Sequence, residues 1–109
     1  MNKIVGTIIG IAAFCISTAA LADAAAGQAK AKQVCAACHG ENGDKPLQPE
    51  YPILAGQHRD YLMKALGDYK SGARKNAIMG AQAQSLEPKD IRDVAEWFSA
   101  QKGPLSIKH

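Results

Sequence analysis

The hydrophobic positions of the chain form one continuous apolar run, followed by three segments of helical period. The run covers residues 4–21. The first periodic segment, residues 24–34, is rich in alanine and lysine, which favour helix. Its residues Gly27, Ala31 and Val34 are spaced by four and three positions, so they share one helical face. We therefore predict a helix over residues 24–34.

The second periodic segment lies between His58 and Gly72, and Ser71-Gly72 is typical of a helix end. Its apolar stripe consists of Tyr61, Leu62, Ala65, Leu66 and Tyr69. Met63 falls about 130° from the centre of this stripe at the 100° per residue of a helix. We expect the Met63 side chain to face away from the core.

The third periodic segment begins at Pro88, a favoured residue in the first turn of a helix, and runs to about Gln101. Its inward face consists of Ile91, Val94, Ala95 and Phe98. Glu87 occupies the expected N-cap position, where Ser, Thr, Asp or Asn would satisfy the first amides better.

Two long segments between the helices lack helical period. Residues 40–57 carry three glycines and three prolines, and residues 73–87 are also expected to be irregular. Loops of this length are uncommon in compact domains unless they wrap around something. The sequence therefore predicts an all-α fold with three main helices and long loops, whose own core is thin.

The beginning of the chain resembles a secretory leader. Lys3 precedes the apolar run, which closes in the triplet "ALA" ending at Ala22, the small-x-small pattern that signal peptidase cuts. We predict a signal peptide at residues 1–22, a domain at 23–109, and export to the periplasm. The alternative is an uncleaved membrane anchor, because 18 mainly apolar residues reach the lower limit of a membrane span. Only that alternative would place the protein on a membrane.

The charge of the chain is modest and dispersed. Thirteen basic and ten acidic side chains give a formal charge of +3, without a long block of one sign. Such a distribution lacks the electrostatic footprint of a nucleic-acid-binding protein. We expect no nucleic-acid partner.

The run "CAACH" places Cys35, Cys38 and His39 within five consecutive positions. A disulfide would close a very small loop and stabilise little. A thioredoxin-like redox pair requires a strand before the motif, and the alanine-rich flank offers none. A zinc site needs four ligands, and only His58 and His109 could join as further nitrogen donors.

Covalent haem attachment explains all three residues of the motif. The two thiols add to the two haem vinyl groups, and the adjacent histidine is then held under the iron. Cys15 lies in the apolar run and would leave with the leader. We therefore predict one covalently bound haem c per chain, tethered by Cys35 and Cys38 and ligated by His39. The haem would also supply apolar volume that the thin core lacks.

The motifs "CAACHG", "PILAG", "NAIMG" and "LEPKDIRDVAEWFSAQ" together resemble those of a class I c-type cytochrome. The resemblance covers essentially the whole chain after the leader, in the same order. It is strongest to one half of the di-haem cytochromes known as c-four and to small single-haem relatives. It implies the small class I cytochrome c fold, wrapped around one haem.

The resemblance also implies roles for individual residues. Met79 would be the distal iron ligand and His39 the proximal one. Pro52 would accept a hydrogen bond from the proximal imidazole, Leu54 would pack on the haem, and Gly27 would lie where the first helix crosses the last. Elimination agrees on the methionine, since only Met63 and Met79 remain after the leader is removed.

An iron with histidine on one face and methionine sulfur on the other has no open position for a substrate. The expected function is therefore electron transfer by a protein that is not an enzyme, between a quinol-oxidising complex and a terminal oxidase or reductase. Two alternatives stay open: a subunit through which electrons enter a larger oxidoreductase, and a gas-binding haem sensor.

Overall fold

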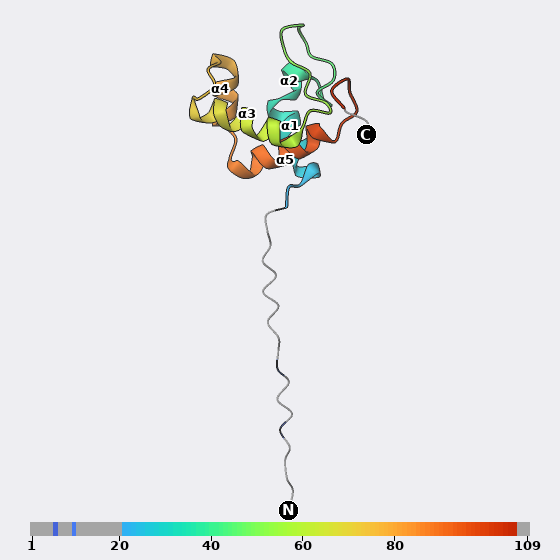
Figure 1. The fold of residues 1–109 in the computed structure, drawn as a ribbon, viewed down its shortest axis with the longest axis vertical. Helices are drawn as coiled ribbons and strands as arrows, with labels where there is room; N and C mark the ends of the chain where they lie inside the picture. The colour runs from blue at the N-terminus through green and yellow to red at the C-terminus, as the bar shows by residue number, and fades with distance from the viewer. Residues whose placement is uncertain (1–5, 7–9, 11–20, 107–109) are drawn as a thin grey trace, which may run out of the picture.

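The computed structural model describes residues 6, 10 and 21–106, and this part of the chain is helical, without strands. Five helices follow one another: α1 (Ala24–Val34), α2 (Ala36–His39), α3 (Arg59–Ser71), α4 (Ala77–Gln84) and α5 (Pro88–Ser99) (Figure 1). The predicted all-α class is confirmed, and the three main helices are α1, α3 and α5. No helix in the described part is long and apolar enough to cross a membrane. Most of the predicted signal peptide and His109 lie outside the described residues.

Helices α1 and α5 cross in direct backbone contact. A Cβ atom added at Gly27 of α1 would lie only 1.9 Å from the backbone carbonyl oxygen of Asp93 on α5. Only glycine allows this approach, because any side chain would collide with the peptide group of the other helix. The predicted crossing at Gly27 is confirmed.

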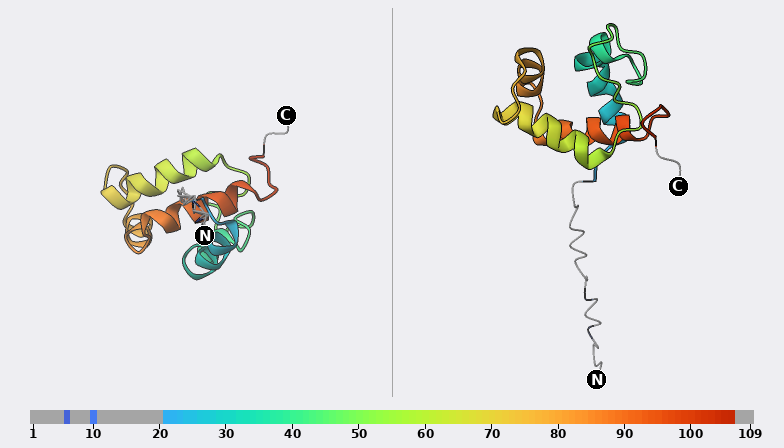
Figure 2. Two further views of the ribbon diagram at one scale, coloured as in Figure 1. Left: turned by 90° about the horizontal axis from the view of Figure 1, so that it is seen from below. Right: turned by 45° about the horizontal axis from the view of Figure 1, so that its top comes forward.

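The core lies where α3 also packs on α5. Figure 2 shows α3 running alongside α5, with α4 at one end of the pair and α1 and α2 at the other. The buried core residues are Ala31, Leu62, Val94, Ala95 and Phe98. Burial of such side chains stabilises the fold by roughly 1.5–3 kcal/mol for each large aliphatic or aromatic residue.

Met63 packs against this core, so the prediction that it faces away is wrong. The error comes from treating α3 as a helix with one buried face. The predicted stripe lines a cavity, and Leu62 in it also belongs to the core, which Met63 meets on the adjoining side of the helix. Helix α3 therefore contacts both the cavity and the core, and Leu62 belongs to both.

The second predicted loop is partly wrong as well, because residues 77–84 form α4. The side-chain oxygen of Asn76 accepts hydrogen bonds from the backbone N–H groups of Ile78 (3.1 Å) and Met79 (3.0 Å), which is a good N-cap. Alanine and glutamine then carry the helix forward. Because α4 has no clear apolar stripe, its periodicity did not reveal it.

The first predicted loop, residues 40–57, is irregular as expected. It is held by backbone hydrogen bonds: the carbonyl of Gly43 accepts from Leu54 (2.8 Å) and Ala55 (3.1 Å), and Gly56 donates to the carbonyl of Phe98 on α5 (2.9 Å). Glu87 is the N-cap of α5, as predicted. Its backbone N–H donates to the Asp90 carboxylate at 2.9 Å, which partly compensates for its unfavourable side chain.

Replacing Gly27 by alanine should destabilise the protein by about 1–3 kcal/mol, because α1 and α5 must separate to admit the methyl group. Gly67→Ala in α3 is the matched control, since a Cβ there meets nothing within 4 Å. That change should stabilise by about 0.5–1 kcal/mol. Denaturant unfolding of the two variants measures both effects, and equal stabilities would contradict the crossing geometry.

Candidate functional site

A cavity of about 650 Å³ is lined by residues of α2 and α4, among others. In Figure 1 the ribbons of these two helices stand apart above α3 and α5. The volume of the cavity lies within the range of about 300–1,000 Å³ that is typical of ligand sites in proteins. Its walls are mainly apolar and come from all five helices and the loop before α3. The aliphatic and aromatic side chains of the wall include Val34, Ile53, Leu54, Leu62, Leu66, Leu86, Val94 and Phe98.

His39 enters the cavity wall from the end of α2 and is buried. Its Nδ1 lies 2.9 Å from the carbonyl oxygen of Pro52. With the proton on Nδ1, the ring donates to Pro52 and its Nε2 is free to bind a metal. The hydrogen bond that the resemblance implies between these two residues is therefore present.

Cys35, the N-cap of α2, and Cys38, within α2, lie on the same wall as His39, and both are free thiols. Burial raises the pKa of the Cys35 thiol to about 11. A redox-active cysteine pair requires a lowered thiol pKa, so this environment disfavours the redox interpretation.

The zinc interpretation also lacks support in the described part of the chain. No three side chains of His, Cys, Asp or Glu there are grouped closely enough to hold a metal ion. His58 is exposed at the N-cap of α3 and does not line the cavity.

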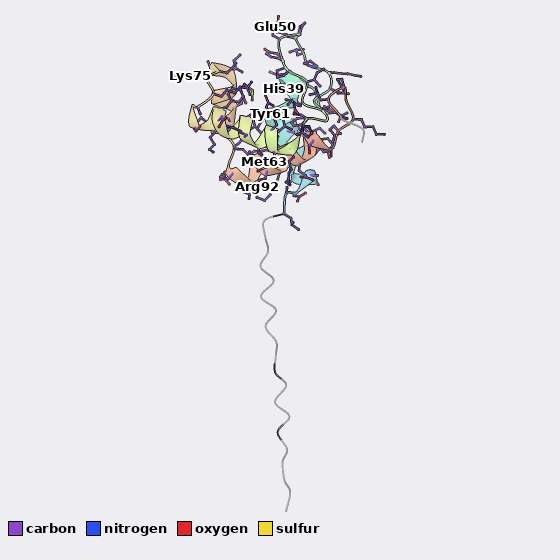
Figure 3. All side chains as sticks on the ribbon, viewed as in Figure 1. His39, Glu50, Tyr61, Met63, Lys75 and Arg92 are labelled. Atoms are coloured by element: carbon purple, nitrogen blue, oxygen red, sulfur yellow. The ribbon has the colours of Figure 1, made fainter. Side chains whose placement is uncertain are left out.

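Met79 lines the cavity from the first turn of α4, where the sequence predicted a loop. It is half-buried, and Asn76, which also lines the cavity, caps its backbone N–H. Met63 does not line the cavity. In Figure 3, the Met63 label lies between those of Tyr61 and Arg92, on the side of α3 towards α5 and away from His39. The structure thus brings Cys35, Cys38, His39, Pro52, Leu54 and Met79 to one cavity.

One cationic feature of the cavity wall was missed by the sequence analysis. The Arg74 guanidinium stacks 4.9 Å from the centroid of the Tyr69 ring, and its Nη1 lies 3.5 Å from the Tyr61 hydroxyl. Hydrogen bonding to Tyr61 and the charge interaction with Tyr69 raise the pKa of Arg74. Arg74 precedes α4 in an irregular segment, so no periodic pattern pointed to it.

Comparison with known proteins identifies the family. The sequence model of the cytochrome c family matches residues 24–102. The chain therefore belongs to the cytochrome c family. It is similar to cytochrome c4 of Pseudomonas aeruginosa, with 41% identity over 102 residues, 94% of this chain and 50% of that protein. It is also similar to cytochrome c-554(548) of Halomonas halodenitrificans, with 43% identity over 83 residues, 73% of this chain and 98% of that protein.

The structural comparison agrees. The crystal structure of reduced recombinant cytochrome c4 from Pseudomonas stutzeri matches with a TM-score of 0.69 and 41% identity, over 76% of this chain and 47% of that one. The chain spans about half the length of these cytochrome c4 relatives. The predicted resemblance to one half of a di-haem cytochrome c4, and the class I cytochrome c fold, are confirmed.

Membership of this family means that the chain carries covalently bound haem c. The residues present fit that cofactor. The cavity is large and mainly apolar, its wall carries the Cys-x-x-Cys-His motif, and the hydrogen bond to Pro52 leaves one nitrogen of His39 available to iron.

Replacing Asn76 by alanine should remove the N-cap of α4 and destabilise the protein by about 0.5–2 kcal/mol. Asn76→Asp is the control, because a carboxylate can accept the same two backbone hydrogen bonds. Denaturant unfolding compares the two variants. If alanine and aspartate were equally destabilising, capping would not be the role of this side chain.

Replacing Arg74 by glutamine should lower the reduction potential, since a positive charge on the cavity wall disfavours the additional charge of ferric iron. Lys75→Gln removes the same charge from the next residue, which is also exposed but does not line the cavity. Its effect should be smaller, because its charge is not held against the cavity wall, whereas Arg74 stacks on the Tyr69 ring of that wall. Redox titration measures both potentials, and equal shifts would argue against a special position of Arg74.

Proposed function

We propose that the chain is a periplasmic electron carrier whose single low-spin haem c is ligated by His39 and Met79. Its electrons would pass between a quinol-oxidising complex and a terminal oxidase or reductase. The observation that supports this most is the placement of His39 and Met79 on one cavity from two separate helices, α2 and α4. The proposal includes removal of residues 1–22 as a signal peptide and a mature domain at 23–109.

The protein groups around the site suit electron transfer rather than catalysis. When bound, haem c supplies one-electron exchange between ferrous and ferric iron. The Pro52 carbonyl fixes the ring of His39 and increases its basicity. A thioether donor such as Met79 favours the reduced state and so a higher potential. With His39 and Met79 both bound to the iron, no position would be left for a substrate.

The walls of the cavity keep water away while the rim reaches the surface. Phe98, Leu86 and Val94 are almost fully buried, so that the deep part of the cavity is rigid and of low polarity. Tyr61 and Ile78 on the rim are 51% and 56% exposed. A redox partner can therefore approach the rim without entering the cavity.

The test of the proposed ligation is Met79→Ala. The variant should keep its covalent haem but lose the weak far-red sulfur-to-iron absorption band, have a lower potential, and bind carbon monoxide when reduced. Met63→Ala is the matched control, because Met63 packs on the core and does not line the cavity. It should keep the band and the potential, at a cost in stability.

Two results would contradict the proposal. A far-red band that survives in Met79→Ala and disappears in Met63→Ala would show that the ligand is assigned wrongly. Carbon monoxide binding by the unmodified reduced protein at neutral pH would favour a gas-binding protein over an electron carrier.

A further inference from the structure

Asp93 on α5 is a buried carboxylate, only 2% exposed, that lies outside the cavity. Its Oδ1 accepts a hydrogen bond from the backbone nitrogen of Asp23 at 2.8 Å, and its Oδ2 pairs with Lys89 Nζ. A carboxylate without partners is costly to bury, so both contacts matter to the fold. The contact with Asp23 joins the beginning of α1 to α5, 70 residues away in the chain.

The nitrogen that Asp93 binds belongs to the residue that follows the "ALA" triplet of the leader. Asp23 has an extended backbone and is the N-cap of α1, with Oδ1 accepting from Ala25 (2.9 Å) and Ala26 (3.1 Å). Leu21, two residues earlier, is 85% exposed. A cut after Ala22 would turn the bound peptide nitrogen into the α-amino group of the mature chain.

We propose that Asp93 is the binding site for the α-ammonium group of the processed chain. Cleavage after Ala22 then replaces a neutral amide hydrogen bond with a buried ion pair between the beginning of α1 and the middle of α5. The inference depends on the proposed export and cleavage. It gives the cleavage site a structural role, because the mature chain gains an ion pair that the precursor cannot form.

The charges around Asp93 are compatible with a second cation. Burial raises the pKa of Asp93, but hydrogen bonds from the Asp23 nitrogen and Lys89 outweigh it, so that the pKa lies below its usual range. The positive charge of Arg92 also lowers the pKa of Asp93. The nearby Asp90 carboxylate pairs with Lys30 of α1 at 3.7 Å. The Asp23 carboxylate lies close enough to act on Lys89, and it would also favour a positive charge on its own nitrogen.

The ion pair has a definite dependence on pH. A free α-amino group has a pKa of about 7.7–8.0. Pairing with the Asp93 carboxylate should raise this pKa in the folded protein above its unfolded value. The extra stability is therefore fully present below about pH 8 and is lost as the pH rises through the pKa of the folded state. In a chain that keeps residues before Asp23 this nitrogen carries no charge, so this contribution is absent.

The experiment compares the holoprotein that begins at Asp23 with one that retains Leu21 and Ala22. Charge-assisted hydrogen bonds are roughly twice as strong as neutral ones. The extended protein should therefore have an unfolding equilibrium constant about fivefold larger at neutral pH. The difference should shrink as the pH is raised towards about 10, above the ordinary pKa of the α-amino group. NMR titration of the Asp23 α-amino group should show a raised pKa.

Asp93→Asn provides the second arm, since it removes the charge but keeps the shape. Introduced into both proteins, it should abolish the pH-dependent difference between them. Asp90→Asn is the matched control, because it removes a neighbouring carboxylate that pairs with Lys30 and not with Asp23. It should leave that difference in place. If Asp93→Asn does not fold, the inference is tested by the NMR titration and by comparing the stabilities of the proteins that begin at Asp23 and at Leu21.

Two different results would overturn the inference. If the stabilities of the two proteins depended on pH in the same way, and the α-amino pKa were unshifted, Asp93 would not bind the ammonium group. That result would leave the proposed electron carrier untouched. The mass of the exported protein identifies its first residue. A first residue other than Asp23 would refute both the cleavage site and the inference. The axial ligands would still be judged by Met79→Ala alone.

Discussion

The contact on which the rest of the structure depends is the crossing of α1 and α5. Gly27 brings the two backbones together at the Asp93 carbonyl, and the buried Asp93 side chain holds the beginning of α1. Helix α1 continues into Cys35 and α2 almost without interruption. The position of His39 relative to α5 therefore depends on this crossing. A site for electron transfer benefits from this rigidity, because ligands that move little keep the reorganisation energy low.

The cavity links the parts of the chain that have little contact with one another. The loop before α3 is held by a few backbone hydrogen bonds and by the contact of Pro52 with His39. Helix α4 is short and is capped at one end by Asn76. Both segments line the cavity, so a haem held by the cavity residues would contribute apolar contacts to each of them. The cofactor would then be part of the core as well as the functional group.

Two errors of the sequence analysis have the same physical origin. Periodicity reveals a helix when one face is apolar and the other polar, and α4 lacks such a division although Asn76 is a good N-cap. Met63 was placed on the polar side of α3, yet α3 contacts the core on one side and the cavity on another. When a helix is buried on two sides, the pattern of apolar residues in its sequence does not show which residue contacts which neighbour.

The sequence by itself determined the class of protein and its chemistry. Cys35, Cys38 and His39 act through fixed local spacing, and the bounds of α1, α3 and α5 follow from periodicity, Pro88 and Gly72. Only the tertiary structure decided which distant groups meet. It placed Met79 and Arg74 on the cavity wall, and it brought the Asp23 nitrogen to the Asp93 carboxylate. Local patterns record the propensity of a segment, whereas such contacts depend on how complete helices cross and pack.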